Sequence, residues 1–185
     1  MYNKIFFVIT GAQGSGKTGV IEKLKRLMPL YLIKYVCTRS KEDDNHNEVT
    51  WEEFQKLAEN DNFIISFNRQ NALFGVTYEE LKKAVESNLP IIWEADLDWL
   101  EIIKNEYPET VFIMINGLSV EDFYERFENK GNALPQASAL MARRSKDLNI
   151  ELNNYVDYVV DNKKDEAENA AQEIKKIIEG KANSH

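Results

Sequence analysis

The glycine-rich octapeptide GAQGSGKT, from Gly11 to Thr18, constrains the fold of this chain more than any other segment. It fits the pattern G-x-x-x-x-G-K-T, in which the glycines let the backbone curl around a polyphosphate where a Cβ atom would clash. The apolar run at 4–10 predicts a buried parallel strand before the octapeptide, and the pattern at 19–27 predicts an amphipathic helix after it. A strand, a glycine-rich loop and a helix in this order predict a phosphate-binding loop.

The chemistry of such a loop assigns roles to its residues. Backbone N–H groups of the loop and of the helix N-terminus point at the anion. We expect Lys17 to bridge the β- and γ-phosphates of ATP and the Thr18 hydroxyl to hold Mg²⁺, so ATP and Mg²⁺ are the expected cofactors. The predicted ATP-binding residues are Gly11, Ala12, Gln13, Gly14, Ser15, Gly16, Lys17 and Thr18.

Composition narrows the class of protein. A chain of 185 residues suits one α/β domain with a hydrophobic core. The net charge of −8 argues against a broad basic surface for nucleic acid, but leaves room for the few local cations that a nucleotide needs. The one cysteine, Cys37, excludes an internal disulfide and is expected to be a small buried residue on a strand rather than a reactive thiol. Because the sequence has neither an apolar stretch long enough to cross a bilayer nor a signal-peptide pattern, we expect a cytoplasmic protein without membrane partners.

The rest of the chain alternates between strand and helix patterns. Strands are predicted over 30–37, 90–96, 110–115 and 156–160, and helices over 51–59, 78–86, 134–148 and 163–179. Helix N-caps with an acidic residue three positions later are predicted at Thr50 with Glu53, Thr77 with Glu80 and Ser119 with Asp122. The segments 62–68 and 73–76 predict a hairpin. This alternation predicts an α/β fold with a mostly parallel central sheet flanked by helices, interrupted by a hairpin-rich insert at 39–86 where a second ligand could bind.

The order of these motifs resembles that of the guanylate kinases, a family of P-loop nucleoside monophosphate kinases, over nearly the whole chain. Thr38-Arg39 stands where the family carries a Thr-Arg pair after its second strand, and His46 stands where it has a tyrosine that binds the acceptor phosphate. The family's G-N-x-Y-G-T turn matches 71–76, its L-D-I-D strand end matches 93–96, and its closing Y-D-x-x-I-x-N matches 156–162 loosely.

The resemblance implies a single domain over 1–185, with a core at 1–38, 87–127 and 145–180, an acceptor-binding insert at 39–86 and a helical lid at 128–144. It implies transfer of the γ-phosphoryl group of ATP to a small phosphorylated acceptor, with a nucleoside monophosphate such as GMP or a relative as the leading candidate. The acceptor-binding residues that it implies are Arg39, Lys41, His46, Phe74, Glu94 and Asp96. The catalytic positive charge would come from Lys17 and from lid residues, for which the candidates are Arg126, Lys130, Arg143 and Arg144.

Several departures from the family bear on the acceptor. The glutamate that reads the guanine edge in guanylate kinases is Ile65 here, and the threonine after the turn glycine is Val76. Phe74 replaces the tyrosine before that glycine, and Glu42 replaces an arginine near the Thr-Arg pair. A site without hydrogen-bonding partners for a purine edge cannot select that edge by orders of magnitude, so we expect weak discrimination between guanine nucleotides and other acceptors.

Two alternative functions stay open from the sequence. Thr38-Arg39, Asn45-His46 and Gly75-Val76 also resemble the ribose bisphosphate kinases of the same superfamily, which makes a sugar phosphate the second candidate acceptor. Guanylate kinase folds also serve as protein-interaction modules, but these have typically lost the phosphate loop that this chain keeps. The sequence decides neither the acceptor nor the oligomeric state.

Some candidate residues also have a purely structural interpretation. Glu94 and Asp96 alternate along a predicted strand, so they would face the ligand crevice together and order Mg²⁺ waters or hold an acceptor hydroxyl. Asp96 would equally serve as the N-cap of a following helix. His46 is explained as well by a solvated loop position, and Trp93 and Trp99 are expected in the core rather than stacked on a base.

Overall fold

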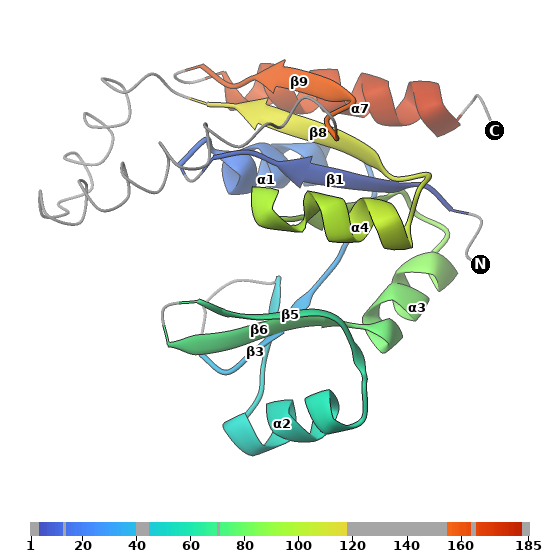
Figure 1. The fold of residues 1–185 in the computed structure, drawn as a ribbon. Helices are drawn as coiled ribbons and strands as arrows, with labels where there is room; N and C mark the ends of the chain where they lie inside the picture. Colours follow the sequence, from blue (N-terminus) through green and yellow to red (C-terminus); the bar gives the residue numbers. More distant parts are fainter. Residues whose placement is uncertain are drawn as a thin grey trace, which may run out of the picture. The chain divides into compact units, whose positions relative to one another are not determined.

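The computed structural model describes residues 4–12, 14–39, 45–69, 71–117, 155–163 and 166–182 (Figure 1). The predictions for Gln13, Lys41, Arg126, Arg143 and Arg144 lie outside these residues, as do those for Lys130, for the helices expected after 119 and over 134–148, and for the lid. The chain divides into two compact units, one formed by 1–4 with 30–92 and the other by 5–29 with 93–185. Each unit is described on its own.

A mostly parallel sheet of five strands forms the centre of the fold, as the sequence predicts. Its strand order is β2-β7-β1-β8-β9. The strands are β2 (Tyr31–Leu32), β7 (Ile91–Glu94), β1 (Phe6–Thr10), β8 (Val111–Asn116) and β9 (Tyr158–Asp161). The pairings of β2 with β7, β1 with β8 and β8 with β9 are all parallel. The carboxyl ends of β1, β8 and β9 therefore meet at one edge, where ligands bind in open α/β sheets.

Helices cover both faces of the strands in the unit that contains β1 (Figure 1). Figure 1 shows α1 (Lys17–Leu27) and α7 (Ala167–Ala182) behind the sheet and α4 (Leu100–Glu106) in front of it. A short 3₁₀ helix, η1 (Leu97–Trp99), precedes α4. Every residue of β1 is buried, which explains why its sequence is a continuous apolar run rather than an alternating one.

The hydrophobic core of this unit forms between the sheet and the two longer helices. The buried residues of the helices are Val20, Ile21, Leu24, Ala170, Ala171, Ile174 and Ile178. Their spacing of three and four residues places them on one face of each helix. Trp93 is fully buried at the end of β7, which confirms the expectation of a core residue.

The other unit carries a second sheet with the strand order β4-β3-β6-β5. Its strands are β3 (Tyr35–Cys37), β4 (His46–Glu48), β5 (Phe63–Arg69) and β6 (Ala72–Thr77). The predicted hairpin is confirmed, because β5 and β6 are antiparallel neighbours. Cys37 is fully buried on β3, as expected for a small apolar residue.

The two helices of this unit begin where their sequences indicate. Helix α2 (Trp51–Glu59) carries the predicted capping box, in which Thr50 and Glu53 bond each other's backbone N–H groups. Helix α3 (Tyr78–Glu86) is capped by Thr77, whose hydroxyl accepts a hydrogen bond from the Glu80 N–H at 3.2 Å. The Glu80 carboxylate, which is buried, does not return to the cap but bonds Lys34 and Tyr31.

The hydrogen bond from Lys34 N–H to Glu80 explains why the single strand predicted over 30–37 is wrong. The segment 30–37 forms two short strands in different sheets instead of one. The ladder of β2 with β7 ends at the bond from Ile33 N–H to Ile92 C=O, and the next amide, Lys34 N–H, donates to Glu80 Oε1 at 2.8 Å. An amide that bonds a side chain cannot bond a neighbouring strand, so the first sheet ends there.

Other element boundaries move by a few residues. Strand β7 ends at Glu94, so Asp96 lies beyond the strand rather than on it. Strand β9 begins at Tyr158. The residue before it, Asp157, donates its N–H to the Phe112 carbonyl oxygen and accepts a hydrogen bond from the Phe112 N–H through its carboxylate. Helix α7 covers 167–182 rather than 163–179. No helix in the described part of the chain is long and apolar enough to cross a membrane.

The Tyr31–Glu80 contact links the stability of this unit to pH. Tyr31 Oη donates to Glu80 Oε1 at 3.2 Å. Burial first, and then the charge and the hydrogen bond of Glu80, raise the pKa of the Tyr31 phenol from its ordinary value to about 12. The folded chain therefore keeps a proton that the unfolded chain loses near pH 10. This contribution to stability is complete below about pH 10 and disappears as the pH rises through the folded pKa.

We predict that Tyr31→Phe lowers stability near neutral pH but weakens the loss of stability between about pH 10 and about pH 12. The variant lacks the phenol whose ionisation favours unfolding. Urea unfolding of both proteins across this range measures the difference. Identical slopes of the free energy of unfolding against pH would contradict the prediction.

Candidate functional site

The loop between β1 and α1 has the backbone that its glycines allow. Gly11 has φ 145° and Gly16, the N-cap residue of α1, has φ 91°. A Cβ atom on Gly11 would lie 2.5 Å from the carbonyl oxygen of Ile115 on β8. The loop therefore lies directly against β8 and opens at the N-terminus of α1, which is a favourable place for an anion.

Lys17 lies across this loop. Its ammonium group donates to the carbonyl oxygens of Gly11 at 2.7 Å and Ala12 at 3.3 Å, while the Ser15 N–H closes a turn onto Ala12 O at 3.0 Å. The positive charge of Lys17 is thus held beside the loop backbone, in the first turn of α1. A polyphosphate in the loop would have this charge within reach.

Thr18 and Glu94 come together from two elements. Thr18 lies in the first turn of α1, and its Oγ1 donates to Glu94 Oε1 at 3.2 Å. Glu94 is the last residue of β7 and is only partly buried. A hydroxyl and a carboxylate supply the oxygen ligands that Mg²⁺ prefers, while exposure leaves room for the waters that Mg²⁺ retains. These donors fit a magnesium ion held at Thr18.

Two buried hydroxyl groups at the loop also fit a phosphate. Thr10 Oγ1, at the end of β1, and Ser15 Oγ, within the loop, have no hydrogen-bond partner in the described part of the chain. A buried hydroxyl without a partner costs about 1–3 kcal/mol, and phosphate oxygens are strong acceptors.

Two residues that sequence reasoning gave no role lie against the middle of the loop. The Asn162 side chain donates to the Ser15 carbonyl oxygen at 2.8 Å, and both residues are buried. A Cβ atom on Gly117 would overlap Ser15 Cα and Cβ, so only glycine fits after β8. Asn162 is the last residue of the motif at 156–162, so its place in that motif could have indicated a role. Nothing in the sequence singled out Gly117.

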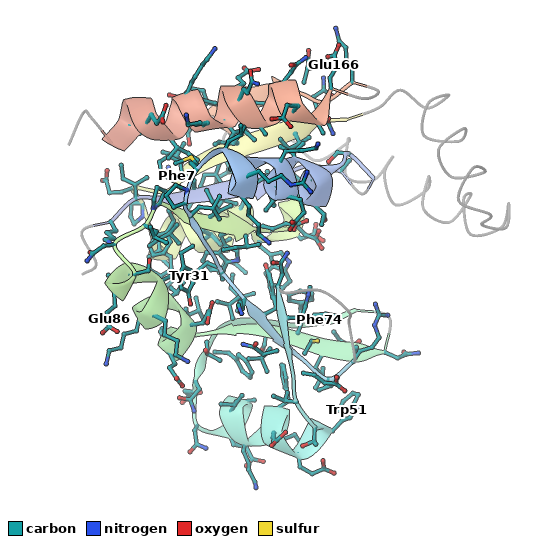
Figure 2. All side chains as sticks on the ribbon, turned by 180° about the vertical axis from the view of Figure 1, so that it is seen from behind. Phe7, Tyr31, Trp51, Phe74, Glu86 and Glu166 are labelled. Atoms are coloured by element: carbon teal, nitrogen blue, oxygen red, sulfur yellow. The ribbon has the colours of Figure 1, made fainter. Side chains whose placement is uncertain are left out.

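The acceptor candidates His46 and Phe74 meet in a cluster of rings on the second sheet. His46 stacks on Tyr35 with ring centroids 5.9 Å apart and meets the edge of Phe74 at 5.9 Å. Phe67 stacks on Phe74 at 5.5 Å and meets Tyr35 edge-on at 6.2 Å. Figure 2 labels Phe74 on this sheet. We call Tyr35, His46, Phe67 and Phe74 the ring cluster; Tyr35 and Phe67 were not singled out from the sequence.

His46 is therefore not a solvated loop residue. It begins β4, pairs with Tyr35 across the parallel β3–β4 ladder and is partly buried. Ile65 and Val76, the departures from the guanine-reading residues, are also placed in this sheet. They pair across the hairpin and are 5% and 0% exposed. We call these two buried side chains, which carry no hydrogen-bonding groups, the apolar wall.

Arg39 follows β3 and is exposed, so its guanidinium is accessible to a phosphate. Hydrogen bonds fix the backbone beside it, because Cys37 Sγ donates to the Arg39 carbonyl oxygen at 2.9 Å. In addition, the Thr38 N–H donates to the Leu73 carbonyl oxygen, and the Leu73 N–H donates to Thr38 Oγ1. Asp96 occupies the N-cap position of η1, but its carboxylate makes no capping hydrogen bond there. The expected N-cap position of Asp96 is therefore confirmed, although it does not involve a side-chain hydrogen bond.

Comparison with known proteins identifies a family. A family model described as guanylate kinase matches residues 3–181. The chain is 30% identical to a guanylate kinase of Caldanaerobacter subterraneus subsp. tengcongensis, over 94% of this chain and 86% of that protein. It is 25% identical to a guanylate kinase of Thermotoga maritima, over 93% of this chain and 84% of the relative.

Solved structures agree on the fold. The crystal structure of guanylate kinase from Anaplasma phagocytophilum has a TM-score of 0.69 at 20% identity, with 98% of this chain and 87% of that chain covered. A shikimate kinase from Acinetobacter baumannii in complex with shikimate has a TM-score of 0.52 at 13% identity, with 97% and 96% covered. Both likenesses support the α/β fold.

We predict that Gly117→Ala destabilises the protein by about 1–3 kcal/mol, because the added methyl group must displace the Ser15 backbone. The matched control is Gly180→Ala in α7, where an added Cβ meets nothing within 4 Å. That control is expected to gain about 0.5–1 kcal/mol from helix propensity. Urea unfolding measures the free energy of unfolding of both variants. Equal values for the two would contradict the close packing at Gly117.

Proposed function

The chain belongs to the guanylate kinase family, and on that premise we propose that it transfers the γ-phosphoryl group of ATP to a nucleoside monophosphate. The proposal rests on the geometry where the loop meets α1. There the Lys17 ammonium donates to loop carbonyl groups, and the Thr18 hydroxyl donates to Glu94. A non-catalytic interaction module would have no use for this arrangement. The products are ADP and a nucleoside diphosphate.

The donor site acts through charge and position. Transfer of a phosphoryl group needs its donor and acceptor aligned and the negative charge on its oxygens stabilised. Lys17 supplies a fixed positive charge, and the loop N–H groups orient the phosphates. Thr18 and Glu94 would hold Mg²⁺, which when bound neutralises phosphate charge. Glu94 contacts Thr18 directly, so we place it with the metal rather than with the acceptor.

The acceptor site is proposed at the second sheet. Arg39 can bind a phosphate in a bidentate manner, with His46 and Lys41 as further donors. The partly buried members of the ring cluster, Tyr35, His46 and Phe67, would offer a π face to a planar base, which every nucleobase can use. Asp96 remains a proposed contact of the acceptor. The proposed lid residues Arg126, Arg143 and Arg144 would add positive charge to the transferred group and exclude water.

GMP is the leading acceptor, because the matched relatives are guanylate kinases. The sugar-phosphate alternative finds no support in the comparisons. The apolar wall of Ile65 and Val76 nevertheless cannot bond a guanine edge, so we propose that contact area rather than hydrogen bonding selects the base. The single free thiol fits a reducing compartment, and we propose the cytoplasm.

The deciding experiment is a screen of nucleoside and sugar monophosphates for ADP formation that depends on the added acceptor. A kinase produces ADP in proportion to the acceptor consumed, whereas an ATP-binding interaction module does not. Acceptor-independent hydrolysis alone would refute the proposal.

We predict that Lys17→Ala lowers turnover by ~10²–10³, because a fixed charge at the transferred group is lost. The control is Lys23→Ala on the same helix, which removes only an exposed ion pair with Glu168 and leaves turnover unchanged. Acceptor-dependent ADP release and circular dichroism are measured for both. A folded Lys17→Ala protein with wild-type turnover would rule out the assigned donor site.

We predict that the wild-type protein prefers GMP to AMP by less than ~10³ in kcat/KM, and that Ile65→Glu with Val76→Thr increases this preference. The two new side chains restore hydrogen-bonding partners for the guanine edge. Ile65→Leu is the control, since it repacks the wall without adding a polar group and should leave the ratio unchanged. A strong native preference for GMP would mean that other residues read the base.

A further inference from the structure

The middle of the phosphate-binding loop is fixed by a residue far from it in the sequence. Asn162 Nδ2 donates to Ser15 O at 2.8 Å, and the two residues are 4% and 1% exposed. Asn162 is itself fixed, because its N–H donates to the Asn116 carbonyl oxygen at 2.8 Å and so extends the β8–β9 ladder by one bond. The Ser15 carbonyl is therefore bound to a rigid strand end.

The orientation of this carbonyl determines that of the next amide. In a trans peptide the C=O of one residue and the N–H of the following residue point in opposite directions. The described residues contain no cis peptide bond. With Ser15 C=O directed at Asn162, the Gly16 N–H points the opposite way within the same peptide plane, away from the strand end.

The backbone of Gly16 does not by itself fix that orientation. Gly16 has φ 91°, and glycine adopts positive and negative φ about equally well, so a flip of the 15–16 peptide has little steric cost. A flipped peptide would turn the Ser15 carbonyl oxygen toward the anion, where its partial charge is repulsive. The hydrogen bond from Asn162 opposes this flip, because breaking it leaves a buried amide and a buried carbonyl without partners.

We propose that Asn162 is a positioning residue for the donor nucleotide. By binding the Ser15 carbonyl it holds the Gly16 N–H toward the phosphate groups of ATP, without touching them itself. Gly117 contributes by leaving space for the Ser15 backbone at this contact. The inference rests on the donor half of the proposed function and is independent of the acceptor.

Asn162→Asp tests the hydrogen bond itself. The new side chain has the same shape but presents oxygen acceptors to the Ser15 carbonyl, so packing is kept and the donor is lost. We expect the Kd for Mg·ATP, measured by calorimetry without acceptor, to rise ~10-fold or more, which corresponds to the loss of about 1.4 kcal/mol of binding free energy. The KM for ATP should rise by a similar factor. The KM for the acceptor should change by less than about twofold.

Asn116→Ala is the matched control. Asn116 Nδ2 donates to Asp161 Oδ1 at 2.8 Å on the same pair of strands, but this bond is exposed and does not reach the loop. The control should keep wild-type affinity for Mg·ATP. Asn162→Ala, with the side chain removed, should show the same selective loss of ATP affinity as Asn162→Asp.

Two outcomes would overturn the proposal. One is a folded Asn162→Asp protein with wild-type affinity for Mg·ATP. The other is an equal loss for ATP and acceptor that follows a fall in Tm, because that pattern marks a purely structural residue. A wild-type protein that binds Mg·ATP but shows no acceptor-dependent turnover would refute the kinase proposal alone and leave the binding test of Asn162 intact.

Discussion

The close approach of the phosphate-binding loop to the ends of β8 and β9 is the constraint on which the proposed donor site depends. Gly11 lies against the Ile115 carbonyl, Gly117 lies against Ser15, and Asn162 bonds the Ser15 carbonyl. The two glycines bring backbone against backbone, and the Asn162 side chain that bonds the loop is buried at the end of β9. The loop N–H groups are thereby oriented before a ligand arrives, which spares binding the free energy of ordering them.

Features encoded within a few residues were predictable from the sequence. The octapeptide, the capping box of α2, the cap at Thr77 and the β5–β6 hairpin each depend on neighbours in the chain, and each is present. The family, with its fold, was also accessible, because its motifs keep their order even where single residues have changed.

Features that depend on distant residues were not predictable. The end of β2 depends on Glu80, which lies 46 residues beyond the Lys34 amide that it binds. The strand position of His46 follows from its pairing with Tyr35, which no local pattern indicates. Asn162 reaches a loop residue 147 positions away, so its contact becomes visible only when the strands are placed side by side.

The buried thiol of Cys37 has a practical consequence for studying the chain. It is the only cysteine, it is fully buried on the central β3 strand of the second sheet, and its Sγ bonds the Arg39 carbonyl oxygen. A thiol reagent can reach it only when that sheet opens, so the rate of labelling measures local opening at the strand that leads to Arg39. A ligand that binds at Arg39 and closes the sheet would slow that labelling, which gives a readout of binding at Arg39 that needs no turnover.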